Sequence, residues 1–441
     1  MSWKKVRLAE LCRIEKGTTG IQKAISGKYP LVVTSEERKS HNEYQFDDEA
    51  VAIPLVSSTG HGHRSLNRIH FQKGKFALGS ILCAVIPNDK KILSAEYLYR
   101  YLDLNKESEL VSRMRGMANV TLPMKEIGQI EIPLPPLVEQ EKFATSYQIL
   151  EKKNNDLSTE LTHQLDLVKQ LRQAFLREAM QGKLVPQDSS DESASKLLKK
   201  IKAEKEQLIK EGKLKKQKEL PPFKPEVIPF EIPQSWVWCN FIDIVDIQSN
   251  LVSPFKYPYS PHIAPDNIQK DTGRLIGYRT VLEDEVKSGN HYFYAGQLIY
   301  SKVRPKLNKV VKVDFEGLCS ADMYPLRPRI NRDFLLYCML SEYFLVEVDK
   351  FDNRVKMPKI NQSQLSQIPV PLPPLSEQHR IVAKLEQLMR YCDELEQSIK
   401  QSQTQNEQLL QQVLREALSP DNKPKGKSYK LKEEVSMAAE D

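Results

Sequence analysis

The pattern most suggestive of catalysis is Pro265-Asp266 followed by Glu285-Val286-Lys287. Two carboxylates and a lysine at this spacing can hold Mg²⁺ and assist an attacking water, as in nucleases of the PD-(D/E)xK type. Such short patterns are common, however, in a chain in which 28% of the residues are charged, and Glu283-Asp284-Glu285 also fits a solvated loop. The sequence therefore leaves a Mg-dependent DNA endonuclease as an alternative function.

Other catalytic and metal-binding motifs are incomplete. Gly426-Lys427-Ser428 ends like a phosphate-binding loop, but Asp421 stands where the first glycine is needed. Leu220-Pro221-Pro222-Phe223 begins with an aliphatic residue where adenine methyltransferases hold the flipped base with Asn or Asp. His61-Gly62-His63 offers two imidazoles without a third ligand, and no two of the six cysteines form a CxxC pair. We predict no catalytic residue and no metal site in this chain.

Basic residues gather in short segments that suit DNA binding. Two segments are Gly62-His63-Arg64 and Arg113-Met114-Arg115, and two more are 302–309 and 354–359. If the 302–309 segment is a strand, alternation places Lys302, Arg304 and Lys306 on one face, which could contact phosphates. Arg or Asn side chains there could read base edges. A solvated basic strand explains any one segment equally well. The candidate DNA-binding residues are Arg64, Arg113, Arg115, Lys302, Arg304, Lys306, Asn308, Lys309, Arg354 and Lys356.

The charge distribution favours a polyanionic partner, although solvated charged surfaces are the commoner cause of such an imbalance. The net charge is +7, and residues 196–218 hold ten Lys against three Glu. Residues 1–129 carry 20 Lys and Arg against 14 Asp and Glu. No apolar run is long enough to span a bilayer, and the first residues lack the apolar core of a secretory signal, so we expect a cytoplasmic protein.

A duplication organises the chain. Residues 130–140, Ile-Glu-Ile-Pro-Leu-Pro-Pro-Leu-Val-Glu-Gln, return 238 positions later as Ile-Pro-Val-Pro-Leu-Pro-Pro-Leu-Ser-Glu-Gln at 368–378. A weaker match relates the segment around Trp3 to that around Trp236. The sequences between these matches do not align, so the chain has a repeated scaffold that carries two different inserts.

A long helix is expected after each proline run. Stretches 138–181 and 376–418 contain no Pro or Gly and are rich in Leu, Gln, Glu and Lys. Apolar residues at alternating steps of four and three predict a coiled-coil seam, interrupted by polar residues, in which the two helices pair antiparallel around a pseudo-two-fold axis. The helix-pairing residues are Leu150, Leu157, Leu161, Val168, Leu171, Phe175, Leu388, Leu395, Ile399, Leu409 and Val413.

The inserts are predicted to be α+β. Strands are expected at 50–56 and 297–303, and helices at 95–102 and 332–340. The predicted organisation begins with a first insert at 1–129, a proline run with helix at 130–181, and a Lys-rich linker at 182–231 whose Lys-rich part can form a solvated helix. It continues with a second insert at 232–367, a second proline run with helix at 368–420, and a disordered tail at 421–441.

The duplicated proline runs that open long helices, together with Gly182-Lys183-Leu184-Val185-Pro186-Gln187, resemble the specificity (S) subunit of type I restriction-modification systems. The resemblance covers nearly the whole chain. It extends to Ala50–Gly62, to Ile201–Lys205 in the linker, and to Gly317–Leu326.

The resemblance implies that the inserts are two target recognition domains, each built of α and β elements. It implies a non-catalytic subunit that reads a bipartite, asymmetric double-stranded DNA target and binds modification (M) and restriction (R) subunits. M subunits would methylate adenine and R subunits would cleave. S-adenosylmethionine, ATP and Mg²⁺ would then be held by the partners, and no cofactor by this chain. A coiled-coil scaffold without DNA binding is a further alternative.

Overall fold

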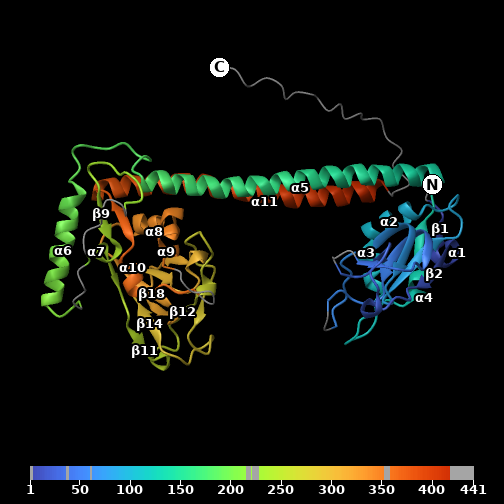
Figure 1. Ribbon diagram of the computed structural model, residues 1–441, viewed down its shortest axis with the longest axis horizontal. Helices are drawn as coiled ribbons and strands as arrows, with labels where there is room; N and C mark the ends of the chain where they lie inside the picture. Colours follow the sequence, from blue (N-terminus) through green and yellow to red (C-terminus); the bar gives the residue numbers. More distant parts are fainter. Residues whose placement is uncertain are drawn as a thin grey trace, which may run out of the picture. The chain divides into compact units, whose positions relative to one another are not determined.

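The computed structural model describes residues 3–35, 39–59, 62–214, 220, 228–351 and 358–417. The chain divides into a first unit, residues 1–162 with 400–441, and a second unit, residues 163–399. Two long helices, α5 (Leu137–Met180) and α11 (Leu375–Ala417), each contribute one part to each unit (Figure 1).

The first unit is built on a six-stranded sheet in the order β2-β7-β5-β6-β3-β4, in which only β3 and β6 are parallel. The strands are β2 (Cys12–Lys16), β3 (Tyr29–Val32), β4 (Lys39–His41), β5 (Phe46–Pro54), β6 (His70–Leu78) and β7 (Leu82–Pro87). The short helices are α1 (Leu8–Leu11), α3 (Lys106–Glu109) and α4 (Met124–Gly128). The strand predicted at 50–56 is confirmed as the end of β5.

Helix α2 (Ala95–Leu104) lies between this sheet and α5 (Figure 1). Tyr97 is 1% exposed, and its ring centroid is 5.6 Å from that of Phe143 on α5. Val51 and Ile53 of β5 belong to the same hydrophobic core. Burial of these apolar side chains holds the start of α5 against the sheet of the first unit.

The second unit has two sheets, in the orders β10-β18-β15-β16 and β11-β14-β17-β12-β13, and β12 is parallel to β17. The strands of the first sheet are β10 (Val245–Ile247), β15 (Leu298–Ser301), β16 (Val310–Lys312) and β18 (Met323–Pro328). The strands of the second sheet are β11 (Leu251–Val252), β12 (Pro261–Ile263), β13 (Arg279–Thr280), β14 (Asn290–Phe293) and β17 (Gly317–Cys319). The short helices are α7 (Phe241–Ile244), α9 (Glu342–Asp349) and α10 (Gln362–Ser366).

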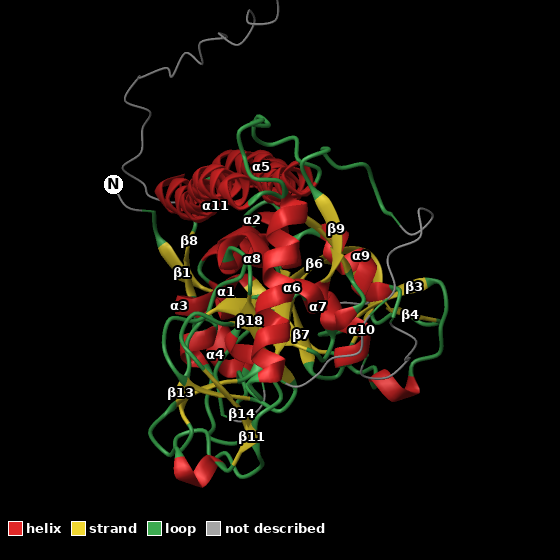
Figure 2. Cartoon of the chain, turned by 90° about the vertical axis from the view of Figure 1, so that its left-hand side faces the viewer, coloured by secondary structure: helices red, strands yellow, loops and turns green. Residues whose placement is uncertain are grey.

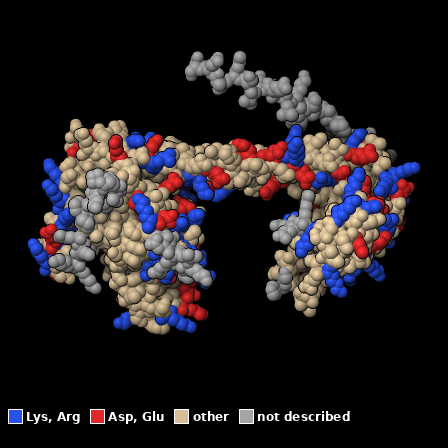
Figure 3. Space-filling model, viewed as in Figure 1, with Lys and Arg blue, Asp and Glu red and all other residues tan. Residues whose placement is uncertain are grey.

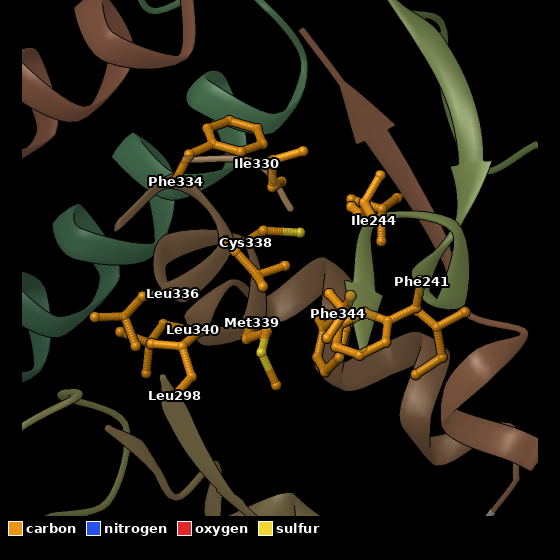
Figure 4. Packing of buried hydrophobic residues seen from close by; sticks show 14 of the residues in the cluster. Phe241, Ile244, Leu298, Ile330, Phe334, Leu336, Cys338, Met339, Leu340 and Phe344 are labelled. Carbon is orange, nitrogen blue, oxygen red and sulfur yellow. The ribbon is translucent and has the colours of Figure 1, made fainter. Parts of the chain in front are cut away.

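Helix α8 (Arg332–Leu340) anchors the core of the second unit and confirms the helix predicted at 332–340. Figure 4 shows Phe334, Cys338 and Met339 of α8 among apolar side chains from other elements, including Phe241 of α7 and Leu298 of β15. All five side chains are completely buried.

The proline runs pair with the segments that open each unit. Strand β1 (Lys5–Arg7) is antiparallel to β8 (Glu131–Pro133), and β9 (Val237–Asn240) is antiparallel to β19 (Pro369–Leu372). The two ends of each insert therefore lie side by side, and both ends belong to segments that the sequence repeat relates.

The glutamine that ends each repeated motif has a structural role. The Gln140 amide donates to the Pro135 carbonyl at 2.8 Å, and its oxygen accepts from the Ser94 backbone at 2.9 Å. Gln378 donates to the Pro373 carbonyl at 2.9 Å, and its oxygen accepts from the Asn331 backbone at 2.9 Å. Ser94 and Asn331 are the N-caps of α2 and α8. Each buried glutamine thus connects a proline run, through hydrogen bonds, to the N-terminus of the helix that follows its N-cap residue, α2 in the first unit and α8 in the second.

The long helices are antiparallel in both units, as predicted. In the first unit the Asn406 amide donates to the Asn154 oxygen at 2.8 Å, and Leu414, near the end of α11, is 1% exposed in the core. In the second unit Leu176, near the end of α5, is 3% exposed in the core. Arg172 on α5 pairs with Asp393 on α11 at 2.7 Å. Each helix begins after one insert and ends in the core of the unit that holds the other.

The predicted seam is only partly correct. Leu161 and Val168 are buried at 7% exposure, and Cys392, which lies between Leu388 and Leu395 along the predicted seam, is fully buried. The exposed seam residues, at 36–59%, are Leu157, Leu171, Leu395, Leu409 and Val413, so their assignment to helix pairing is wrong. On α11 the predicted position Ile399 is half-buried, and so are Glu396 and Leu410 beside the exposed leucines, while Leu414 is buried. Polar side chains such as Glu396, which pairs with Arg172 at 3.0 Å, occupy part of the seam.

The Lys-rich linker contains helix α6 (Ala194–Lys210), which packs against α7 (Figures 1 and 2). Ile201 is 3% exposed within the core of the second unit, so α6 is not simply a solvated helix. Lys205 is 7% exposed and lies 3.3 Å from Asp246, which also accepts from Arg329 at 2.5 Å. Burial lowers the pKa of Lys205, although Asp246 opposes this shift. The predicted tail at 421–441 lies outside the described residues.

Candidate DNA interface

The two units share one backbone arrangement next to their central strands. In the first unit, Val56 forms an antiparallel bridge with Thr121. In the second unit, Val303 forms an antiparallel bridge with Lys359. Val56 and Val303 follow the equivalent strands β5 and β15, and Thr121 and Lys359 are separated by 238 residues, the offset of the sequence repeat.

The hydrogen bonds around the bridges match as well. In the first unit, Ser57 donates to Val120 at 3.0 Å and Leu122 donates to Leu55 at 2.9 Å, all through the backbone. In the second unit, Arg304 donates to Pro358 at 2.9 Å and Ile360 to Lys302 at 3.0 Å. We call residues 55–59 and 62–65 with 113–122 the first loop site, and residues 302–309 with 358–360 the second loop site.

The first loop site brings together the two basic segments predicted in the first insert. A Cβ built on Gly62, where φ is +81°, would lie 2.3 Å from the carbonyl oxygen of Met117. The two loops therefore touch at a place that only glycine fits. Arg64 is exposed and forms no ion pair with another described residue, whereas Arg115 lies 2.8 Å from Glu126 with its side chain 70% exposed.

Arg113 is less accessible than its neighbours in the loop. Its side chain is 31% exposed and lies 3.5 Å from Glu109, and its Nε is buried. Of the three candidate arginines in the first unit, Arg64 and Arg115 are therefore the better placed to contact a ligand.

The predicted basic strand face in the second unit is wrong. Strand β15 ends at Ser301, and a turn of 3-10 helix follows at Pro305–Leu307. Arg304 and Asn308 flank this turn with φ of 46° and 44°. Alternation stops because proline lacks a donor for a strand and the left-handed residues turn the chain. Lys302, Arg304 and Lys306 consequently belong to a loop.

The residues of this loop have different roles. Arg304 is exposed, and the Lys302 amine lies 5.0 Å from the centre of the Tyr324 ring. The Lys306 amine is 2.9 Å from Asp349, with the lysine side chain 65% exposed. These three side chains remain candidates for phosphate contacts.

Asn308 and Lys309 serve the fold. Asn308 is completely buried and donates to the Leu340 carbonyl at 3.3 Å, so the prediction that it contacts DNA is wrong. The Lys309 side chain is 14% exposed and donates to the Pro265 carbonyl at 2.7 Å. The remaining two candidates, Arg354 and Lys356, lie outside the described residues.

Lys359 belongs to the predicted basic segment 354–359 but was not among the candidate DNA-binding residues. Its amine lies 3.0 Å from Asp322, and its backbone bridges to Val303. The signal was present in the repeat, because the offset of 238 relates Lys359 to Thr121 in the first loop site. Buried His291 lies near this loop, and burial, followed by the charge of Lys302, lowers its pKa.

Positive and negative side chains are mixed on both units. Figure 3 shows Lys and Arg interspersed with Asp and Glu on the face that it draws. Position within the repeated loop arrangement, rather than regional charge, therefore selects these residues as candidates.

A comparison with protein families identifies the scaffold. Residues 1–167 and 243–404 match the model of the type I restriction modification DNA specificity domain. The chain belongs to this family of specificity subunits.

Curated relatives agree with the family assignment. The chain is 35% identical over 418 residues to the type I restriction enzyme EcoDI specificity subunit of Escherichia coli, a match that covers 95% of this chain and 88% of that subunit. It is 34% identical over 258 residues to the EcoAI specificity subunit of Escherichia coli, covering 56% and 44% of the two chains.

Solved structures show the same fold. A chain from a study of complex assembly and conformational transition of a type I R-M system matches with a TM-score of 0.66 at 18% identity, covering 95% of this chain and 98% of that chain. The HsdS subunit from Thermoanaerobacter tengcongensis matches with a TM-score of 0.50 at 17% identity, covering 95% and 97%.

The residues of the nuclease alternative have other surroundings in this specificity subunit. Asp266 is fully exposed and lies 3.3 Å from the Lys309 amine. Glu285 is exposed with φ of 49°. Among the described residues, no group of three or more His, Cys, Asp or Glu is arranged to hold a metal ion. His63 is exposed, and His61 lies outside the described residues.

None of the described helices is long and apolar enough to cross a membrane. The expected cytoplasmic location stays a prediction.

Proposed function

We propose that this specificity subunit reads a bipartite, asymmetric DNA target through its two loop sites, one in each recognition domain. The observation that carries the proposal is the recurrence of one backbone arrangement, at Val56–Thr121 and Val303–Lys359, around different side chains. The repeated backbone arrangement would let both domains bind DNA in the same orientation, and the different side chains would give each domain its own base preference.

The first loop site offers Arg64 and Arg115, and the second offers Lys302, Arg304 and Lys306. Arginine is suited to bidentate contacts with guanine, and lysine to phosphates. The ion pairs of Arg115 and Lys306 are exposed, so their stabilising contribution is small and phosphates can replace the carboxylates.

We propose that M subunits dock on the outer faces of the long helices. Exposed leucines occur in both units: Leu157 (44%) and Leu409 (59%) in the first, and Leu171 (39%) and Leu395 (48%) in the second. The offset of 238 relates Leu157 to Leu395 and Leu171 to Leu409. Apolar residues repeated on both helices and left uncovered suit two copies of one partner.

The chain itself is proposed to be non-catalytic. Its phosphate-binding, cofactor-binding and base-holding motifs are incomplete, so methylation of adenine and cleavage of DNA are assigned to M and R subunits. S-adenosylmethionine, ATP and Mg²⁺ are accordingly assigned to those partners.

The test is reconstitution of the subunit with its M subunit, followed by measurement of adenine methylation and of DNA affinity against salt concentration. Arg64→Ala and Arg304→Ala should weaken binding. Lys73→Ala, whose lysine is 75% exposed and paired with Glu49 at 2.9 Å, is the matched control. DNA cleavage by the purified chain with Mg²⁺ alone would favour the nuclease instead, and absence of DNA binding with M present would favour a scaffold.

A further inference from the structure

The matched backbone of the two units includes a further segment that lies outside the loop sites defined above. In the first unit the Leu55 backbone donates to the Ile81 carbonyl at 2.8 Å, and in the second unit the Lys302 backbone donates to the Asp322 carbonyl at 3.0 Å. Ile81 directly precedes β7, which pairs with β5, and Asp322 directly precedes β18, which pairs with β15. Ile81 and Asp322 therefore occupy equivalent positions.

The side chains at the equivalent positions differ in charge between the units. They are uncharged in the first unit and charged in the second. The equivalent pairs, with the first unit named first, are Leu55 and Lys302, Ile81 and Asp322, and Thr121 and Lys359. The same backbone arrangement thus carries a carboxylate with two lysines in the second recognition domain, and uncharged side chains in the first.

The backbone of Asp322 is held in a defined place beside the second loop site. Its N–H donates to the Ser320 hydroxyl at 3.2 Å, and its carbonyl accepts from the Lys302 backbone. The next residue, Met323, pairs with Ser301 on β15. A side chain at the end of a sheet strand can be placed against a base more precisely than one on an unsupported loop.

The Asp322 carboxylate is accessible and has an oxygen to spare. Its side chain is 43% exposed, and its Oδ1 accepts from the Lys359 amine at 3.0 Å. Its Oδ2 forms no hydrogen bond with any described residue. Because an ionised carboxylate is only an acceptor, Oδ2 can receive a hydrogen bond from a donor on a ligand. The Lys359 amine has three donors, so it can keep its ion pair and also contact that ligand.

This pair of charged groups suits one base pair better than the others. DNA phosphates repel a carboxylate, so Asp322 is favourable at the interface only where a base donates a hydrogen bond to it. In the major groove, cytosine presents its N4 amine as a donor, and the paired guanine presents the acceptors O6 and N7 beside it. The carboxylate matches the cytosine donor, and the Lys359 amine, 3.0 Å away, matches the guanine acceptors. An adenine amine is also a donor, but its pair carries the apolar thymine methyl group, which does not suit two charged side chains.

We propose that Asp322 is a specificity-determining residue of the second recognition domain, and that its carboxylate accepts a hydrogen bond from the N4 amine of a cytosine in the DNA target. Lys359 balances the charge of the carboxylate and faces the acceptors of the paired guanine. The first domain does not read a base in this way, because Ile81 occupies the equivalent position. This inference rests on the proposed function and deepens it, because it names a base that the second domain recognises.

The test is a double-mutant cycle between Asp322 and the base amine. The full chain is assembled with its M subunit and bound to a duplex that carries its methylation target. Each cytosine of the target is replaced in turn by deoxyzebularine, which lacks the 4-amino group, and each adenine by purine deoxyriboside, which lacks the 6-amino group. Loss of one cytosine amine should weaken DNA binding by the wild-type complex about 5- to 150-fold, and should have little further effect on the Asp322→Ala complex.

The inference is overturned if no cytosine amine contributes to binding by the wild-type complex, a result that does not depend on any variant. It is also overturned if loss of the amine weakens the Asp322→Ala complex as much as the wild-type complex, or if Asp322 is coupled to an adenine amine instead. These results, from a complex that methylates its target, leave the proposed function standing. A complex without any sequence-specific methylation would contradict the proposed function, and this inference with it.

Two further variants separate base reading from the ion pair. Lys359→Ala breaks the pair but keeps the carboxylate, so its complex should still lose affinity when the cytosine amine is removed. The matched control is Asp314→Asn, because Asp314 is also an exposed carboxylate in an ion pair, with Arg332, and follows β16 at the end of β15 opposite to Lys302. Its complex should bind the target and each analogue like the wild-type complex. If Lys359→Ala and Asp322→Ala abolish the effect of the amine equally, Asp322 acts only through its ion pair and the proposal is wrong.

Discussion

The end of α11 should stabilise the first recognition domain, although the helix begins after the second. Leu414 is 1% exposed in the core that includes Tyr97 and Phe143. Removing a buried leucine side chain destabilises a core by about 2–5 kcal/mol. For Leu414→Ala we expect about 3 kcal/mol, which raises the opening equilibrium of the first unit roughly 150-fold.

The assay is hydrogen exchange of the full chain, followed by mass spectrometry. Amides of β1, β8 and α2 should exchange faster in Leu414→Ala, and those of β15 and β18 should not change. Leu409→Ala is the matched control on the same helix, because Leu409 is 59% exposed and its loss should change stability by at most about 0.5 kcal/mol.

Two results would refute this reasoning. One is an equal loss of stability in Leu414→Ala and Leu409→Ala, which would mean that the two positions are not distinguished by burial. The other is faster exchange confined to the second unit, which would place the end of α11 in the wrong core.

Three further predictions address the loop sites, the motif glutamines and a buried histidine. Arg304→Ala should reduce the salt dependence of DNA affinity by about 0.9 in log–log slope if it neutralises one phosphate, whereas Lys73→Ala should not; an unchanged slope excludes that contact. Gln378→Ala should lower the free energy of unfolding by about 1–3 kcal/mol for each buried group that it leaves unpaired, as measured by urea unfolding. The control Gln412→Ala, at an exposed position, should leave the free energy of unfolding almost unchanged. Equal urea midpoints for the two variants would contradict this prediction. Burial lowers the pKa of His291, so its neutral form stabilises the fold above pH about 6.5, and this contribution is lost as the pH falls through the lowered pKa. The variant His291→Gln should therefore show a smaller decline of melting temperature from pH 7 to 5 than the wild-type protein. An identical decline would show that His291 does not titrate as inferred.

The sequence was most informative where structure depends on local pattern. The duplicated proline runs, the two long helices, the helix at 332–340 and the strand within 50–56 all follow from short-range periodicity and from proline. The antiparallel arrangement followed from chain order, because each helix leaves one insert and leads toward the next.

Features that depend on long-range contacts were missed or misplaced. The bridges Val56–Thr121 and Val303–Lys359 join segments more than 50 residues apart, which no local pattern reveals. The prediction of a basic strand face from Lys302 onward was wrong because two left-handed residues and Pro305 turn the chain. The seam was partly misplaced because its residues were assigned by choosing apolar positions such as Leu395. In the helix pair, the polar neighbour Glu396 instead faces the other helix and pairs with Arg172.

The central claim is that each recognition domain reads its own half of a bipartite target. Residues 1–129 should be replaced by the corresponding recognition domain of a relative with a different target, and the hybrid expressed with its M subunit in a host that lacks other adenine methylation. Sequencing of methylated adenines should then show one half-site changed and the other half-site retained. A methylating hybrid in which both half-sites change, or neither does, would contradict the account.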